Sequence, residues 1–236
     1  MNALITGADR GLGLALVEGL AGRGWRVFAG QYMPDWPDLA ALQERFPGRV
    51  DTVPLDVGDI ESARAAARAV AAQVDCIDLL VSNAGVISAT SGRTLRESQD
   101  YGEMHRQFDV NALGALRVVE AFLPLTDPSA LKRLCFVSSE AGSIGRSRRT
   151  SWYGYCMSKA ALNMAVSILF NHLRPEGYSF RLYHPGSMRS WMHGHKNTAA
   201  EMEPEAAAAA ALSCFLGEQD EDRLVLRDYR GGEYPW

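Results

Sequence analysis

The stretch ITGADRGLG (Ile5–Gly13) joins a short apolar run to an amphipathic one and carries glycines at positions 7, 11 and 13. The apolar run, Ala3–Thr6, is typical of a buried β-strand, and Gly11–Gly22 follows a helical pattern. Glycines at such a junction allow a tight turn, let the backbone approach a phosphate closely, and aim a helix N-terminus at it. The spacing predicts a binding site for the phosphates of a dinucleotide, and a plain turn is the alternative.

Similar apolar and amphipathic runs alternate along the rest of the chain. Strands are expected at Arg26–Gln31, Val50–Leu55, Leu79–Ser82, Arg133–Ser138, Ser179–Tyr183 and Leu224–Leu226, and helices at Leu39–Phe46, Ile60–Val74, Met104–Phe122, Tyr155–Leu173 and Pro204–Leu216. Strands that are apolar throughout are typical of a parallel sheet covered by helices on both faces. With right-handed crossovers, the pattern predicts an α/β Rossmann fold, a doubly wound parallel sheet of about seven strands, as a single domain over residues 1–236.

The composition is that of an ordinary soluble globular protein, with 47% hydrophobic and 22% charged residues. A net charge of -4 gives no general attraction to nucleic acid or to anionic membranes. There is no apolar run long enough to span a membrane and no secretory leader, so a cytoplasmic location is expected. The four cysteines are scattered without a CxxC pair, which favours reduced thiols and no metal site.

Five further motifs follow the glycine turn. They are Leu55-Asp56-Val57, Ser82-Asn83-Ala84-Gly85, Asn111 within DVNALG, the serines of FVSSEAGS with Tyr155 and Lys159 after them, and HPGSMRS (His184–Ser190). Together with TGADRGLG they resemble, in order and along essentially the whole chain, the short-chain dehydrogenase/reductase family, although Ser82 replaces the first asparagine of that family's NNAG. The ending YRGGEYPW and the phrase SSEAGSIGR are similar to a narrower group of C-factor-like and carbonyl-reductase-like members.

The resemblance implies an NAD(P)(H)-dependent oxidoreductase that transfers a hydride between nicotinamide and a carbonyl or alcohol. By matching motifs, the cofactor would be held by Gly7, Arg10, Gly11, Leu12, Gly13, Asp56, Val57, Asn83, Ala84, Gly85, Tyr155, Lys159, Pro185, Gly186 and Ser190. The resemblance also implies a homodimer or homotetramer, with Met104–Phe122 and Tyr155–Leu173 as contacts. The alternative function is a dinucleotide-binding sensor or a C-factor-like signalling protein with little turnover.

Hydride transfer to a carbonyl requires a proton donor, and a tyrosine hydroxyl can serve. Lys159 follows Tyr155 by four residues, so both lie on one helix face, and the lysine charge would stabilise the phenolate. Tyr153 has Met157 at that position instead. The resemblance further implies that Ser139 orients the substrate carbonyl, with the adjacent Ser138 as the alternative.

The resemblance places Asn111 in a helix, where it would hold a water that links Lys159 to solvent. The alternative for Asn111 is an amide that satisfies a helix kink.

The end of the second strand carries no acidic residue before Asp35 to hold an adenosine ribose. Arg10 could instead pair with a ribose 2′-phosphate, which favours NADP(H) over NAD(H). The alternative for Arg10 is a solvated loop charge.

The polar segment at about 187–205 is expected to cover the substrate as a lid. Its His193 and His195 are interpreted as solvated residues, because no carboxylate or thiol accompanies them as a metal ligand. The loop Arg146–Arg149 is interpreted as solvated, with contact to an anionic substrate as the alternative. Cys156 is interpreted as a packing residue.

Overall fold

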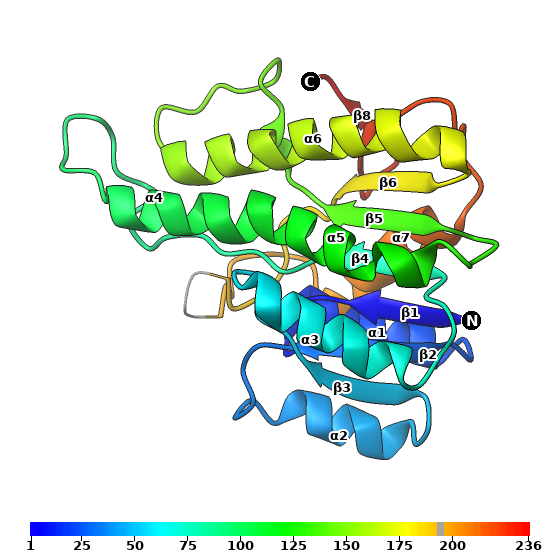
Figure 1. Cartoon of the computed structure of the whole chain (residues 1–236). Helices are drawn as coiled ribbons and strands as arrows, with labels where there is room; N and C mark the ends of the chain where they lie inside the picture. Colours follow the sequence, from blue (N-terminus) through cyan, green and yellow to red (C-terminus); the bar gives the residue numbers. More distant parts are fainter. Residues whose placement is uncertain (193–195) are drawn as a thin grey trace.

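One eight-stranded sheet crosses the protein in a computed structural model that describes residues 1–192 and 196–236 (Figure 1). Its strands are β1 (Asn2–Ile5), β2 (Arg26–Gln31), β3 (Val50–Pro54), β4 (Leu79–Ser82), β5 (Arg133–Val137), β6 (Ser179–His184), β7 (Leu226–Asp228) and β8 (Glu233–Tyr234). They run in the order β3-β2-β1-β4-β5-β6-β7-β8. All neighbouring pairs are parallel except β7 and β8, which are antiparallel.

Helices cover both faces of this sheet. The α-helices are α1 (Gly11–Ala21), α2 (Asp38–Arg45), α3 (Ile60–Ala71), α4 (Tyr101–Phe108), α5 (Gly114–Thr126), α6 (Tyr153–Leu173) and α7 (Pro204–Leu216). Figure 1 shows α3, α5 and α6 in front of the sheet and α1 and α7 behind it. Successive residues of a strand point to opposite faces, so Ala3 and Ile5 join one core with α1, α2 and α7, and Leu4 joins the other with α3, α5 and α6.

The predicted doubly wound α/β fold is confirmed, with eight strands in place of about seven. The strand expected at Leu224–Leu226 begins at Leu226 and ends at Asp228. Asp228 then accepts hydrogen bonds from the backbone of Arg230 and Gly232, which closes a tight turn into β8. A strand of two residues is too short to show an alternating pattern, which explains why the sequence did not predict β8.

The helix predicted at Met104–Phe122 begins earlier and ends later, and its middle is not α-helical. It runs from Tyr101 to Thr126, with the π-helical segment η1 (Asp109–Leu113) between α4 and α5. The Asp100 side chain caps its start by accepting from the backbone nitrogen of Glu103 at 3.0 Å. On either side of η1, α4 packs against α6 and α5 packs against α3.

The helix predicted at Tyr155–Leu173 begins at Tyr153. Trp152 precedes it in the left-handed backbone region, with φ of 69°. Tyr153 therefore belongs to the first turn of α6 rather than to the loop before it.

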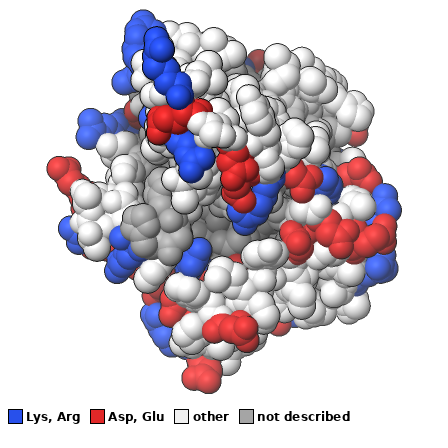
Figure 2. Space-filling model, turned by 90° about the vertical axis from the view of Figure 1, so that its left-hand side faces the viewer, with Lys and Arg blue, Asp and Glu red and all other residues white. Residues whose placement is uncertain are grey.

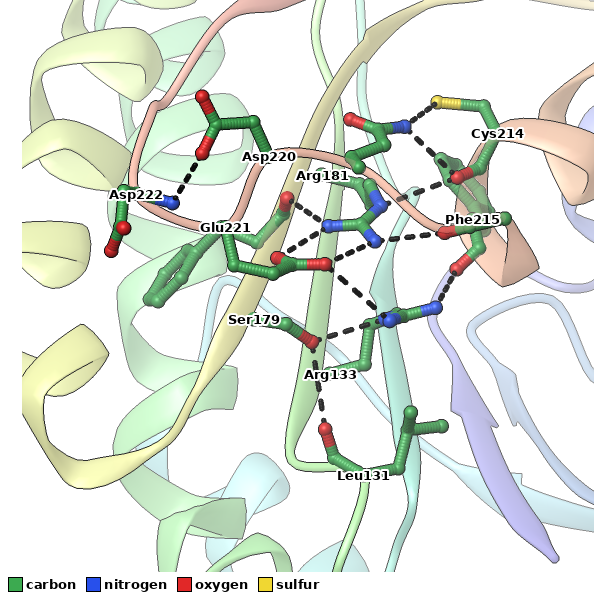
Figure 3. A network of polar contacts seen from close by, with 12 residues as sticks. Leu131, Arg133, Ser179, Arg181, Cys214, Phe215, Asp220, Glu221 and Asp222 are labelled. Carbon is green, nitrogen blue, oxygen red and sulfur yellow. Dashed lines mark hydrogen bonds and ion pairs between the residues drawn. The ribbon is translucent and has the colours of Figure 1, made fainter.

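Two arginines of the sheet hold the C-terminal end of α7 (Figure 3). Arg181, on β6, is fully buried and donates to the carbonyl oxygens of Cys214 and Gly217 and to both carboxylate oxygens of Glu221. Arg133, on β5, donates to the carbonyl of Phe215 at 2.9 Å. Since the last carbonyls of a helix lack intrahelical donors and carry partial negative charge, these contacts satisfy the end of α7.

Strands β2 and β3 lie on one side of β1, and the chain then returns to add β4 and the later strands on the other side. The strand order therefore reverses between β1 and β4. Loops diverge at such a point and leave a crevice at the carboxyl ends of the strands. The glycine turn and the N-terminus of α1 lie at this crevice, where the candidate site is found.

Candidate functional site

A cavity of about 910 Å³ follows the carboxyl ends of the strands. In Figure 2 this edge of the sheet faces the viewer and is hollowed, with acidic and basic side chains along the rim. Each residue proposed from the sequence for catalysis or cofactor binding lines the cavity, apart from Asn111. One continuous space therefore joins the glycine turn to Tyr155.

The glycines of the turn leave free the space that the Cβ atoms of other residues would occupy. Gly7 has φ of +62°, and a Cβ there would lie 2.9 Å from the Cα of Ala84. A Cβ on Gly13 would lie 2.1 Å from the carbonyl oxygen of Gly7. Only glycine fits these positions, and the result is a backbone cradle that opens into the cavity at the N-terminus of α1. This cradle fits the pyrophosphate of a dinucleotide.

Thr6 and Asn83 hold the cradle against β4. The Thr6 hydroxyl accepts hydrogen bonds from the backbone nitrogens of Asn83 and Ala84 at 3.0 and 2.9 Å. The Asn83 amide donates to the carbonyl oxygens of Thr6 and Gly7 at 3.0 and 3.1 Å. Asn83 was proposed as a cofactor residue, and in this structure its amide fixes the shape of the turn.

Asp9 is a site residue that the sequence did not reveal. It is buried, and its carboxylate accepts from the backbone nitrogens of Tyr32 and Met33, the latter at 2.8 Å. Because these amides follow the end of β2, Asp9 ties the glycine turn to the loop where an acidic ribose ligand was sought. No spacing signal relates residues 23 and 24 positions apart, so only the fold brings them together.

Arg10 lines the cavity beside the loop after β2 and is not free in solvent. Its guanidinium stacks 4.7 Å from the centre of the Trp36 ring and donates to the carbonyl of Trp191 at 3.3 Å. The two tryptophan rings meet edge to face at 5.5 Å. Asp56 also lines the cavity and accepts from the backbone of Gly58 at 2.8 Å.

Tyr155 and Ser139 meet at the other end of the cavity. Ser139 follows β5, and its hydroxyl accepts from the backbone nitrogen of Ala141 at 3.1 Å. Burial raises the pKa of Tyr155 to about 12, and the nearby Ser139 hydroxyl offsets only part of this shift. The Tyr155 hydroxyl is therefore protonated at neutral pH. Ser138, the alternative to Ser139, instead donates to Asn163 inside the protein at 2.6 Å.

Lys159 is buried one helical turn after Tyr155. Its ammonium donates to the carbonyl of Val137 at 3.0 Å and lies 5.9 Å from the centre of the Tyr155 ring. Burial lowers the pKa of Lys159 to about 8. The predicted spacing thus brings the two side chains to one face of α6.

Asn111 lies in the π-helical segment η1 and holds the loop after β4 against α6. Its side chain accepts from the backbone nitrogen of Val86 at 2.7 Å and donates to the carbonyl of Val86 at 2.9 Å. Its second amide hydrogen goes to the Ser158 hydroxyl at 3.0 Å. These contacts go to Val86 and Ser158 rather than to the backbone of η1, and the water that links Lys159 to solvent stays a prediction.

The wall beside Tyr155 is apolar on one side and polar on the other. Ile87, Ala141, Trp152 and Met192 form a cluster with Tyr155, and Trp152 meets Tyr155 edge to face at 5.9 Å. Cys156 packs partly buried against this cluster, and burial raises its pKa, so the thiol is not activated.

The polar side consists of Glu140, Arg149 and His184. Arg149 pairs with Glu140 and stacks 4.7 Å from the centre of the Trp152 ring. Burial lowers the pKa of His184 to about 4, so this imidazole is neutral at physiological pH. No role was predicted for Glu140 or His184, since neither stands at a motif position with a known task.

Pro185, Gly186 and Ser190 continue from the end of β6 along the cavity. The Ser190 backbone nitrogen donates to Met188 at 2.9 Å, and its carbonyl accepts from Asn197 at 2.8 Å. A bridge between Met188 and Met202 closes the base of the segment expected to be a lid, which ends before α7 begins at Pro204. His193 and His195 lie outside the described residues.

Within residues 1–192 and 196–236, no group of three His, Cys, Asp or Glu side chains is placed to hold a metal ion. In the same part of the chain, no helix combines the length and apolar character that crossing a membrane requires.

Comparison with known proteins gives consistent relatives. A family model described as short chain dehydrogenase matches residues 1–201. An uncharacterised oxidoreductase of Schizosaccharomyces pombe is 36% identical over 80% of this chain and 74% of its own. The C-signal protein of Myxococcus xanthus is 39% identical over 68% of this chain and 93% of its own. The crystal structure of NADPH-bound carbonyl reductase from chicken fatty liver is 27% identical, with a TM-score of 0.88 over 100% of this chain and 98% of that one.

Proposed function

Because the chain belongs to the short chain dehydrogenase family, we propose that it is an NADP(H)-dependent oxidoreductase that transfers a hydride between nicotinamide and a carbonyl or alcohol substrate. The observation that carries the proposal is the single cavity that joins the glycine cradle to the Tyr155–Ser139 pair. A cradle alone would suit any dinucleotide binder, whereas a buried proton donor at the far end serves a reaction.

The bound cofactor would supply the hydride, and the protein supplies position and a proton. Ser139 and Tyr155 would both donate hydrogen bonds to the substrate carbonyl oxygen and stabilise the charge that develops on it. Tyr155 would then give its proton to that oxygen as the alcohol forms. Lys159 would hold the ribose of the nicotinamide end and favour the phenolate left on Tyr155. The segment at about 187–205 would cover the substrate.

The reaction should depend on pH differently in its two directions. Reduction uses the protonated Tyr155, which is the dominant form far below a pKa of about 12. Oxidation needs the phenolate, whose population rises with pH. We therefore expect the kcat for alcohol oxidation to increase from pH 7 to 10, while the kcat for carbonyl reduction stays level or falls. A level oxidation profile over this range would contradict the role of Tyr155 as the base.

The decisive test is NADPH oxidation by the purified protein with a panel of aldehydes and ketones. Replacing Tyr155 by Phe removes the proton donor and should lower kcat at least about 100-fold with little change in NADPH affinity. Tyr153→Phe is the matched control, because the Tyr153 hydroxyl donates to the Thr150 carbonyl and does not line the main cavity. Wild-type activity in Tyr155→Phe would overturn the proposed chemistry.

The preference for NADPH rests on Arg10, on the absence of an acidic residue at the end of β2, and on the NADPH-bound relative. Arg10→Gln should raise the Kd for NADPH about tenfold, as expected for one charged hydrogen bond, and change the Kd for NADH little. If Arg10 acted only through its packing on Trp36, the variant would weaken the binding of NADPH and NADH to the same extent. Equal changes for NADPH and NADH, measured by titration, would rule out contact between Arg10 and a 2′-phosphate.

A dinucleotide-binding sensor or signalling protein is the second candidate, and the similarity to C-signal favours it. Such a protein would need the glycine cradle but not Tyr155 as a proton donor. If the wild-type protein binds NADPH and oxidises it with none of the carbonyls, this second candidate replaces the enzyme.

A further inference from the structure

The loop between Ser139 and α6 is held from outside by a segment more than 80 positions further along the chain. The loop Ser143–Ser151 leads from the short 3-10 helix η2 (Glu140–Gly142) to Trp152 and α6. It contains Arg149, which lines the cavity beside Tyr155. The segment Tyr234–Trp236, named here the YPW segment, lies against its first residues.

Two hydrogen bonds join the loop and the YPW segment. The buried Ser143 hydroxyl donates to the carbonyl of Pro235, and the backbone nitrogen of Gly145 donates to the carbonyl of Trp236 at 2.8 Å. Both donors belong to the loop, and both acceptors are backbone oxygens of the YPW segment. The contact therefore depends on the path of the two backbones more than on the identity of exposed side chains.

Tyr234 connects the same loop to the cavity wall. The guanidinium of Arg146 stacks 4.4 Å from the centre of the Tyr234 ring. On its other side, the Tyr234 ring meets the imidazole of His184 edge to face at 5.7 Å. His184 lines the cavity, so one aromatic ring touches both the loop and a residue of the site.

The far end of the loop is held by contacts within the site and by the loop after β4, because the Trp152 backbone nitrogen donates to the carbonyl of Ser91 at 2.7 Å. Arg149 pairs with Glu140 and stacks on Trp152, and Trp152 packs on Tyr155. Apart from these, the described side chains from Ser147 to Thr150 are exposed. The YPW segment is thus the contact that fixes where the loop leaves η2, and the loop carries one wall of the substrate end.

We propose that the YPW segment positions the substrate wall of the catalytic site by holding Ser143–Arg146, which places Arg149 and Trp152 beside Tyr155. Ser143, Gly145 and Tyr234 are positioning residues, because none of them lines the cavity. The effect on catalysis rests on the proposed function, whereas the effect on the loop itself does not. A loosened loop should weaken binding of the carbonyl substrate more than it changes the proton donor or the cofactor cradle.

Gly145→Ala tests this contact directly. A Cβ at Gly145 would lie 2.9 Å from the backbone oxygen of Trp236 and 3.4 Å from Pro235, so the YPW segment must shift. Gly92→Ala is the matched control, since a Cβ there meets no atom within 4 Å. Ser143→Ala is a second variant, which removes the hydroxyl donor and adds no bulk.

Two measurements decide the outcome. Hydrogen exchange should become faster in the peptide that spans residues 143–152 for Gly145→Ala and Ser143→Ala, but not for Gly92→Ala. The KM for the carbonyl should rise about fivefold, as expected for one hydrogen bond, while kcat and the Kd for NADPH stay close to wild type. Unchanged exchange and unchanged KM in both variants would overturn the proposal.

The two proposals fail separately. If the wild-type protein oxidises no NADPH with any carbonyl, the proposed function fails, and the exchange rates still decide whether the YPW segment holds the loop. If the wild type is active and both variants match Gly92→Ala, the positioning role fails and the proposed function stands.

Discussion

Among single residues, Lys159 occupies a position that lowers the stability of the folded protein. It is buried, and among the ion pairs of the described residues none includes it. Its one hydrogen bond to a described residue goes to a neutral carbonyl, that of Val137. A buried cation with so little compensation is destabilising, and burial accordingly lowers the pKa of Lys159 to about 8. Functional sites commonly retain such a cost.

Lys159→Met should make the cofactor-free protein more stable at pH 7, on the order of 2 kcal/mol after the lost hydrogen bond is counted. The folded pKa of about 8 lies below the ordinary 10.5, so between these values the unfolded chain binds more protons than the folded one. The wild type therefore gains stability as pH rises through this window, and the variant does not. Urea unfolding at pH 7 and pH 10 measures the difference.

Lys196→Met is the control for this comparison, because Lys196 is exposed and its removal should change the free energy of unfolding little at either pH. A stability difference between wild type and Lys159→Met that is the same at both pH values would contradict the lowered pKa. The activity of Lys159→Met should fall, since the cation beside Tyr155 is lost.

Residues of the site differ in how far the sequence could predict them. Tyr155 and Lys159 share one helix, so a spacing of four is enough to place them together. Thr6 and Asp9 act through backbone groups that follow the ends of β4 and β2, up to 78 positions away. Such contacts depend on which strands are neighbours in the sheet, and a local sequence pattern does not predict the strand order.

At the scale of elements, the end of α7 is stabilised by the sheet rather than by a cap of its own. The C-cap residue Gly217 has an extended backbone, and its carbonyl accepts from Arg181 at 2.9 Å. Glu221 balances the charge of this buried guanidinium with two hydrogen bonds of 2.8 and 2.7 Å. Figure 3 shows these groups converging between α7 and the two strands. Glu221 thus fastens the segment after α7 to the sheet through ion pairs with Arg181 and Arg133.

Glu221→Gln should lower the free energy of unfolding by about 1–2 kcal/mol, because it leaves the Arg181 charge buried without its partner while part of the carboxylate is already open to solvent. Asp222→Asn is the control: this neighbouring acid pairs with Arg174 at the surface and should change stability by less than about 0.5 kcal/mol. Denaturant unfolding of both variants measures the contrast. Equal losses in the free energy of unfolding would mean that the buried position of Arg181 does not increase the cost of removing its partner.

The sequence predicted the strands well and the interruptions within elements poorly. β2 matches its predicted range, since its apolar centre, Val27–Ala29, is a clear strand signal. The π-helical segment η1 was missed because its residues, DVNAL, fit an ordinary helix. Within η1, Asn111 binds the backbone of Val86 in the loop after β4, a contact that no helical pattern predicts.

At the scale of the whole molecule, α6 leaves a stripe of apolar side chains uncovered. Met157, Met164 and Ile168 are spaced seven and four residues apart, which places them on one face of the helix, and they are 45%, 63% and 60% exposed. Neighbouring apolar groups of this size on a surface commonly mark a contact with another protein. The expected homodimer or homotetramer would bury this stripe.

Light scattering after size exclusion should give the mass of a dimer or tetramer for the wild type, and Met164→Glu should shift it towards the monomer by placing a charge in the contact. Leu95→Glu is the control, since Leu95 is 69% exposed on a loop away from α6. A monomeric wild type at all concentrations would exclude the expected assembly. If Met164→Glu leaves the mass of the oligomer unchanged, the interface lies elsewhere on the protein.

The global fold was the most predictable level. Alternation of apolar strands with amphipathic helices leaves few possible topologies once crossovers are right-handed. The glycine turn after β1 marks the place where the strand order reverses. The shape of the substrate end was the least predictable. It depends on Arg149 and Trp152 from the stretch before α6 and on His184 at the end of β6, which are far apart in the sequence.

The π-helical segment also makes the length of this helix more important than its composition. A π turn holds one residue more than an α turn, so η1 accommodates one extra residue while the core-facing sides of α4 and α5 stay aligned. Deleting one residue other than Asn111 from Asp109–Leu113 would restore regular α-helical geometry and leave Val118 and Phe122 facing the core. An insertion in this stretch, or a return to α-helical geometry without a deletion, would instead rotate α5 by roughly 100° relative to α4. Single-residue deletions should therefore be tolerated here better than single-residue insertions.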